Sequence, residues 1–225
     1  MDFPSFVGPS YPSFSYTADQ ERTVNFYFEK MDVPGATSES ALYPTPGFLD
    51  PDDNLQSLGA AGGGRAHFFQ QGREFFIIGQ HLFECFFDAT CVVRGAVVND
   101  GLPATIHSNG DGGGQLFICS GRNGYVYDLT TNVLTAIVAL VGKARMGDFL
   151  DGYFLALDDQ TSTLYISALF DGSVWNTGTD FAQRSIGTDR WGSMKVLSRY
   201  IYLFGSQTSE IWYDTGATFP FAPHP

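Results

Sequence analysis

The residue types that most often do chemistry are scattered along this chain. Its four histidines are far apart and lack metal-type spacing, and no Cys-x-x-Cys pair accompanies them to complete a zinc site. The three cysteines are Cys85 and Cys91, with five residues between them, and Cys119. An odd count fits a reducing compartment better than a disulfide framework, so we expect buried cysteines that act as small hydrophobic side chains. We predict no metal and no cofactor.

Motifs for nucleophilic or phosphate chemistry are also missing. No Gly-x-Ser-x-Gly sequence occurs, and neither glycine run, 62–64 or 112–114, is followed by Lys-Ser/Thr. The segment Asn109-Gly110-Asp111-Gly112 carries oxygen ligands for calcium, but Asn-Gly and Asp-Gly are strong hairpin signals, and we predict a turn there. The paired carboxylates Asp52/Asp53 and Asp158/Asp159 also fall in predicted turns.

One further segment, Asp171-Gly172-Ser173-Val174-Trp175, resembles the aspartate-box turn of sialidase propellers. Leu169 stands where that motif has Ser or Thr two positions before the aspartate. A structural turn with a packed tryptophan accounts for it without sugar chemistry. No catalytic constellation emerges from the sequence, and we predict that the protein is not an enzyme.

The composition excludes further functions. The 225 residues carry a net charge of −12 with no basic run, which disfavours binding to nucleic-acid phosphates or to an anionic membrane. The longest apolar stretch, 133–141, is too short to span a bilayer, and the N-terminus does not read as a secretory signal. We therefore expect a soluble protein made in a cytoplasm. Phe, Tyr, Val, Thr and Gly are favoured over helix formers, which indicates an all-β protein.

Four segments of the sequence share one pattern, and the strands that it predicts would position any functional site. Each has an apolar-aromatic strand, a short polar turn and a second strand with alternating aromatics. Taking Phe76, Phe117, Phe154 and Tyr202 as equivalent positions gives spacings of 41, 37 and 48 residues. The predicted strand pairs lie within 74–86, 115–129 (turn at 120–124), 152–167 and 199–214.

Repeats near 40 residues made of short strands are typical of propeller blades. We predict an all-β fold of β-propeller-type repeats, with about four blades in residues 65–225. These blades either close into a small propeller, or continue beyond this chain as part of a larger ring, or have their ends covered by partner chains. A β-sandwich is the alternative. Residues 1–64 hold seven of the 11 prolines and are predicted to be an extended segment that packs on or between the blades, with one strand at 23–29.

Three stretches resemble a known family. Residues 23–29 (TVNFYFE) with 41–48 (ALYPTPGF) are similar to the opening "VNxYPE … ALYxTPGL" of the packaged-DNA-stabilisation, or tail hub, proteins of short-tailed bacteriophages. Phe28 and Phe48 replace that pattern's proline and leucine. Residues 202–216 (YLFGSQTSEIWYDTG) resemble the family's "LWLFGxxTxEVWYNTG", and 149–154 its "FLDGYF".

The resemblance implies a structural virion protein of the head-to-tail region that seals the packaged genome below the portal and its adaptor. It implies a tail hub with a DNA exit channel, which DNA passes without sequence-specific contact. The implied partners are copies of the chain itself in a hexameric ring, portal-adaptor proteins and tail fibre or needle proteins. Candidate structural or interface residues taken from these motifs are Asn25, Tyr27, Pro46, Gly47, Asp151, Gly152, Trp212, Tyr213 and Gly216.

Two alternatives remain open. One is a carbohydrate-binding or glycan-degrading propeller of a phage tail, which should gather acidic, arginine and aromatic side chains in one axial pocket. The other is a cellular propeller scaffold, if the motifs are coincidental.

Overall fold

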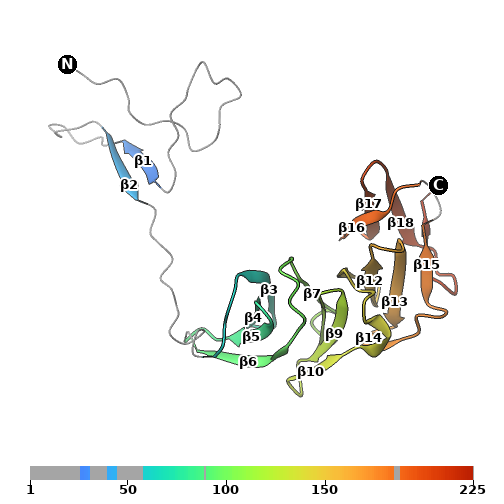
Figure 1. Cartoon of the computed structure of the whole chain (residues 1–225), viewed down its shortest axis with the longest axis horizontal. Coiled ribbons are helices and arrows are strands. Elements are labelled where there is room, and N and C mark those ends of the chain that lie inside the picture. Colours follow the sequence, from blue (N-terminus) through green and yellow to red (C-terminus); the bar gives the residue numbers. More distant parts are fainter. Residues whose placement is uncertain (1–25, 31–39, 45–57, 89, 185–187, 225) are drawn as a thin grey trace, which may run out of the picture. The chain divides into compact units, whose positions relative to one another are not determined.

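A computed structural model describes residues 26–30, 40–44, 58–88, 90–184 and 188–224 of the chain (Figure 1). The chain divides into two units, Met1–Asp50 and Pro51–Pro225. In the first unit, β1 (Phe26–Lys30) pairs antiparallel with β2 (Ser40–Pro44). Strand β1 overlaps the predicted strand at 23–29. Asn25, Pro46, Gly47 and the Asp52/Asp53 pair lie outside the described residues, and the packing of 1–64 on the blades stays a prediction.

The second unit consists of four antiparallel sheets that follow one another along the chain, coloured from teal to red in Figure 1. Blade 1 comprises β3 (Gly64–Gln70), β4 (Arg73–Ile78), β5 (His81–Cys85) and β6 (Cys91–Ala96). Blade 2 comprises β7 (Thr105–Ser108), β8 (Gln115–Ser120), β9 (Asn123–Asp128) and β10 (Val133–Ala136). Blade 3 comprises β11 (Met146–Leu150), β12 (Tyr153–Asp158), β13 (Thr163–Ala168), β14 (Asp171–Trp175) and β15 (Phe181–Gln183). Blade 4 comprises β16 (Trp191–Leu197), β17 (Tyr200–Gly205), β18 (Ser209–Asp214) and β19 (Phe221–Pro223).

Within each blade, strands that are consecutive in sequence are neighbours in the sheet, apart from one irregularity in blade 3. There β14 and β15 both pair with β13, so two short strands share the place of the fourth. A 3-10 helix, Val138–Leu140, follows blade 2. Four separate sheets of consecutive strands are the arrangement of a β-propeller and not of a two-sheet sandwich, so the fold prediction is confirmed.

Tight turns set the register of several hairpins. Asp151 and Gly152 both have positive φ (48° and 93°), as do Ser198 and Arg199 (50° and 68°). Two central residues with positive φ form the turn that matches the twist of paired strands, so two residues suffice to join β11 to β12 and β16 to β17. The predicted turn at 120–124 is shorter in the structure, because β8 ends at Ser120 and β9 begins at Asn123.

Three buried clusters join successive blades. The first packs Phe75 and Leu82 of blade 1 against blade 2, the second packs Phe117 of blade 2 against Phe154 of blade 3, and the third joins blade 3 to Trp191 of blade 4. Phe117 and Phe154 have ring centroids 5.4 Å apart. Most of the alternating aromatic side chains seen in the sequence therefore lie on the faces through which neighbouring sheets pack.

The expectation of free cysteines is wrong for two of the three. Cys85 and Cys91 are paired across β5 and β6 and form a disulfide. Cys119 is free and buried. The odd count concealed this pair, because parity says nothing about which two cysteines a hairpin brings opposite one another.

Candidate functional site

The first strands of successive blades lie side by side, β3 beside β7, β7 beside β11 and β11 beside β16. Three charged or ionisable side chains from these strands meet at Asp148. His107 Nδ1 on β7 lies 3.2 Å from Asp148 Oδ1 on β11, and Lys195 Nζ on β16 donates to Asp148 Oδ2 at 3.0 Å. This group, His107, Asp148 and Lys195, is called the inner-strand network below, and it spans blades 2, 3 and 4.

Both oxygens of the buried Asp148 are fully engaged. Besides the two side chains, Oδ1 accepts the backbone N–H of Phe149 at 2.9 Å and Oδ2 accepts that of Val196 at 2.8 Å. Burial lowers the pKa of His107, against the attraction of Asp148 and with help from the charge of Lys195. A carboxylate held by four groups connects strands and is poorly placed to act as a general base.

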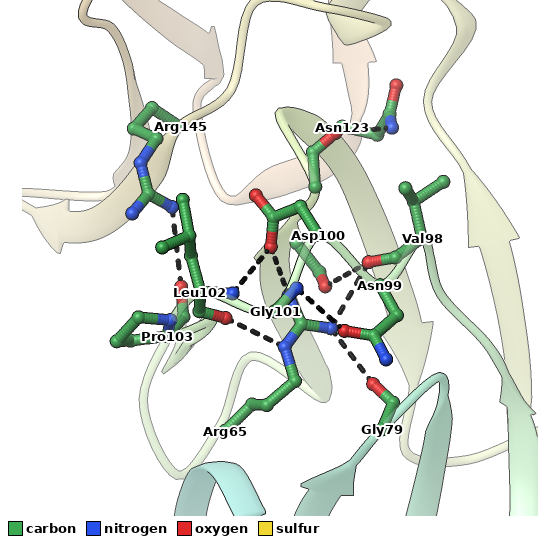
Figure 2. Close-up of polar contacts among 12 residues, drawn as sticks. Arg65, Gly79, Val98, Asn99, Asp100, Gly101, Leu102, Pro103, Asn123 and Arg145 are labelled. Atoms are coloured by element: carbon green, nitrogen blue, oxygen red, sulfur yellow. Dashed lines mark hydrogen bonds and ion pairs between the residues drawn. The ribbon is translucent and has the colours of Figure 1, made fainter. Parts of the chain in front are cut away.

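A second polar cluster holds the connection from blade 1 to blade 2 (Figure 2). Arg65 on β3 donates from Nε to Leu102 O at 2.7 Å, from Nη1 to Gly79 O at 2.9 Å and to Val98 O at 3.2 Å, and from Nη2 to Asp100 Oδ1 at 2.8 Å. Asp100 Oδ1 also accepts the backbone N–H of Leu102 at 3.0 Å. The connection has no regular strand pairing, and the guanidinium of Arg65 supplies hydrogen bonds to its backbone carbonyl groups instead.

Charged groups also join blade 1 to blade 2 at another point. Glu84, 1% exposed at its side chain, accepts from Arg73 Nε at 2.6 Å and from Arg94 Nε at 2.7 Å. Arg73 Nη1 donates in addition to Leu129 O of blade 2 at 2.6 Å. Burial alone would raise the pKa of Glu84, but the bonds from the two arginines outweigh it and lower the pKa. Between blades 2 and 3, Arg122 pairs with Asp158 and with Asp159.

The Asp158/Asp159 pair is therefore accounted for without catalysis. The aspartate-box-like segment is also structural, although it forms strand β14 and not merely a turn. Asp171 Oδ1 accepts the N–H and the hydroxyl of Ser173, and Trp175 is buried and donates to Gly172 O at 2.7 Å. The segment that begins at Asn109 forms a turn, as predicted. The side-chain amide of Asn109 donates to Gly113 O at 3.1 Å and closes this turn.

Of the motif residues that the structure describes, some lie at or near the surface and others are buried. Asp151 lies beside the turn between β16 and β17, with its Oδ1 3.3 Å from Arg199 Nη2. Trp212 is buried, stacks edge-on against Trp191 at 5.5 Å and donates to Glu210 Oε2 at 3.0 Å. Tyr213 is partly exposed on the other face of the same strand.

Gly152 and Gly216 occupy turns with positive φ, and Tyr27 lies on β1 opposite Tyr43. Within the second unit, the buried Trp212 and the partly exposed Tyr213 lie on opposite faces of β18, so the described candidates there do not form one cluster. The interface role of each stays a prediction.

One open cavity of about 260 Å³ lies where blade 3 meets blade 4. Its lining consists of Asp151, Ser198, Arg199, Tyr200, Tyr213 and Asp214. The cavity combines acidic, arginine and aromatic side chains, but it lies at the hairpin turns and not on the first strands of the blades.

Among the described residues, no group of three His, Cys, Asp or Glu side chains could hold a metal ion, and no helix could cross a membrane.

With this geometry in place, the comparison with protein families is decisive. The family described as "Bacteriophage P22 Gp10, beta-propeller" matches residues 18–225. The chain belongs to this family. It is accordingly a phage structural protein of the virion, and the resemblance of its sequence motifs is confirmed. No curated protein matches the chain.

Three solved structures with similar folds are remote in sequence. PorZ of the type IX secretion system of Porphyromonas gingivalis is 11% identical, with a TM-score of 0.43 over 72% of this chain and 21% of PorZ. The designed protein Ika4 is 10% identical, with a TM-score of 0.46 over 69% of this chain and 93% of Ika4. The Neurospora crassa Pan2 WD40 domain is 8% identical, with a TM-score of 0.48 over 72% of this chain and 52% of that chain. The chain thus spans about a fifth of PorZ, and these similarities carry no functional argument.

Sequence reasoning missed the residues that connect the blades, notably Arg65, Glu84 and Asp148. A usable signal was present, since each is a charged residue inside an apolar strand. A charge in such a position is retained when it is paired. The partners lie up to 48 residues away in the chain, as for Asp148 and Val196, and no local pattern could have named them.

Proposed function

We propose that this chain is a head-closure subunit, which binds below the portal and its adaptor, retains the packaged genome and forms part of the tail hub and DNA exit channel. The observation that carries the proposal is the family match over residues 18–225. The partners we assign to it are further copies in a ring, which we propose to be a hexamer, portal-adaptor proteins and tail fibre or needle proteins.

The physical character of the described blades supports a scaffold role. Arg65, Glu84 and Asp148 are held by several partners each, so these charged groups stabilise the structure instead of reacting. With 24 acidic against 12 basic residues, the chain repels phosphates overall. Exiting DNA is therefore not retained along such a surface.

Deleting the gene from the phage that carries it, and supplying it in trans, tests the proposal. Heads that package DNA without the protein should lose it, so that DNase degrades the genome of purified particles. Particles supplied with the chain should keep a protected genome. Protected, infectious particles formed without any copy of the chain would contradict the proposal.

A second candidate function rests on the cavity between blades 3 and 4. Tyr200 and Tyr213 stand opposite one another on β17 and β18, with Asp214 and Arg199 nearby, which is a set of groups suited to sugar hydroxyls and sugar faces. Binding of a glycan panel, measured for the chain and for Tyr213→Ala, distinguishes it. Glycan binding that the substitution removes would favour a carbohydrate-binding propeller, and turnover of a glycan would contradict the non-enzymatic proposal.

A further inference from the structure

The outermost strand of blade 1 has little burial to hold it in place. Strand β6 pairs with β5 alone within its sheet, and of its six residues, all of which the structure describes, none is buried. The register of β5 and β6 also shifts between Leu82 and Phe83. Edge strands with few buried contacts open more readily than central strands. β6 is therefore a strand that a cross-link to its neighbour would stabilise.

The Cys85–Cys91 disulfide lies at the start of that strand and joins it to β5. The two cysteines are directly opposite one another in the register of the hairpin. Beyond them, Phe86 N–H donates to Thr90 O at 2.8 Å. Hydrogen-bonded and non-hydrogen-bonded pairs alternate along antiparallel strands, so the cysteines occupy a non-hydrogen-bonded pair, where side chains come closest. The backbone alone places the two sulfur atoms beside one another.

The hairpin has other contacts that hold it when the disulfide is absent. Thr90 N–H donates to Asp88 Oδ1 at 3.0 Å within the turn, and Arg94 Nε of β6 donates to Glu84 Oε2 of β5 at 2.7 Å. These bonds do not involve the sulfur atoms. We therefore expect reduction to leave two thiols that face one another and can form the bond again.

The three cysteines of the chain differ in their access to solvent. Cys85 and Cys91 are partly exposed, whereas Cys119 is buried. Burial raises the pKa of the Cys119 thiol far above its ordinary value and keeps it protonated. Because the thiolate is the form that attacks a disulfide, Cys119 does not exchange with the pair. Dissolved thiols and disulfides can reach the hairpin pair.

A structural protein of a virion meets two redox environments. It is made and assembled in the reducing interior of the host cell, and it later stands in the oxidising medium around the released particle. We infer that Cys85 and Cys91 form a reversible redox staple, a dithiol during assembly and a disulfide in the released virion, where it holds β6 onto β5. The inference depends on membership of the virion and not on the proposed head-closure role.

A small disulfide such as oxidised glutathione supplies the oxidising equivalents. The thiolate of one cysteine attacks it, forms a mixed disulfide and releases one glutathione thiol. The second cysteine then attacks the sulfur of the first and releases the other glutathione thiol. Two S–H bonds of the protein break and one S–S bond forms, while the small disulfide takes up two electrons and two protons and becomes two thiols. An excess of reduced glutathione reverses both steps.

Hydrogen exchange of the purified chain, followed by mass spectrometry on peptides that cover β6, tests what the staple does. Reducing the wild type should speed exchange of these amides about 30-fold, as expected for a short disulfide loop. The double substitution Cys85→Ser, Cys91→Ser should exchange at the reduced rate with or without reductant, and Cys119→Ala should behave as the wild type. Peptides over β14, an outer strand of blade 3 without cysteine, should not respond to reduction.

Alkylation in the infected cell tests when the pair forms. Free thiols are blocked with N-ethylmaleimide before lysis and, separately, in released particles, and the peptides that contain Cys85 and Cys91 are then identified by mass spectrometry. Both cysteines should be alkylated in assembled intracellular particles and joined in released ones. A disulfide already present inside the cell, free thiols in released virions, or equal exchange of β6 in the oxidised and reduced chain would each overturn the inference.

Discussion

Lys195 Nζ donates to Asp148 Oδ2 across 3.0 Å and so ties the first strand of blade 4 to the first strand of blade 3. The same carboxylate receives the backbone N–H of Val196, which fixes the register of the two strands as well as their distance. Similar ties occur where blades 1 and 2 and blades 2 and 3 meet. The apolar clusters supply the adhesion between blades, and the charged groups specify how the sheets are positioned.

Replacing Glu84 tests the ties between blades 1 and 2. Glu84→Gln removes a buried carboxylate and leaves Arg73 and Arg94 facing one another. Because both arginines are partly exposed, we expect a loss of about 1–3 kcal/mol in the free energy of unfolding, below the cost of a fully buried pair. Urea unfolding measures it. Glu74→Gln on the exposed face should change stability by less than about 0.5 kcal/mol, and equal losses would contradict the assignment.

The inner-strand network predicts a pH dependence. Burial lowers the pKa of His107 below the ordinary value of 6.5, so the unfolded chain binds this proton more readily than the folded protein does. The stability contributed by neutral His107 is therefore complete above that ordinary value and is lost as the pH falls below it. His107→Asn should flatten this part of the profile of unfolding free energy between pH 8 and pH 5. An unchanged profile would contradict the network.

The disulfide predicts a thiol count. Unfolded under non-reducing conditions, the chain should expose one reactive thiol, that of Cys119, and three after reduction. The double substitution Cys85→Ser, Cys91→Ser should cost about 2 kcal/mol, as expected for a short closed loop. Three thiols without reduction would show that the pair is not formed, and Cys119→Ser is the control for the count.

A close contact between blades 2 and 3 predicts an overpacking effect. A Cβ at Gly147 would lie 2.6 Å from Phe117 Cε1 and 3.0 Å from Cys119 Sγ. Gly147→Ala should therefore destabilise the protein by about 1–3 kcal/mol. At exposed Gly178 the nearest atom would be 3.6 Å away, and Gly178→Ala should be close to neutral in the same thermal unfolding experiment. Equal effects would contradict the tight packing.

The sequence predicted the second and third strands of every blade, because each carries an unbroken apolar-aromatic run. It missed the first and fourth strands, which are short or interrupted, such as β7 with its polar His107 and β14 with its bulge. Those segments form strands because they pair with the neighbouring second or third strand of the same blade, and their own sequence carries no clear strand pattern. The same holds for Cys85 with Cys91, whose partnership follows from the hairpin register and not from composition.

The site was less predictable than the fold. Motif residues such as Asp151 and Tyr213 are adjacent to one cavity although they are far apart in sequence, while Trp212, next to Tyr213, belongs to a buried face. Alternation along β18 separates the two neighbours onto opposite sides. A linear motif mixes residues that hold the blade together with residues that face outward, and only the sheet distinguishes them.

The central claim, that this chain is a subunit of the head-closure assembly, is tested most directly by its solution mass with and without the portal–adaptor ring of its phage. Multi-angle light scattering should show the chain moving into the peak of the ring, with a fixed number of copies per ring. A folded chain that remains apart from the ring at every ratio would contradict the claim.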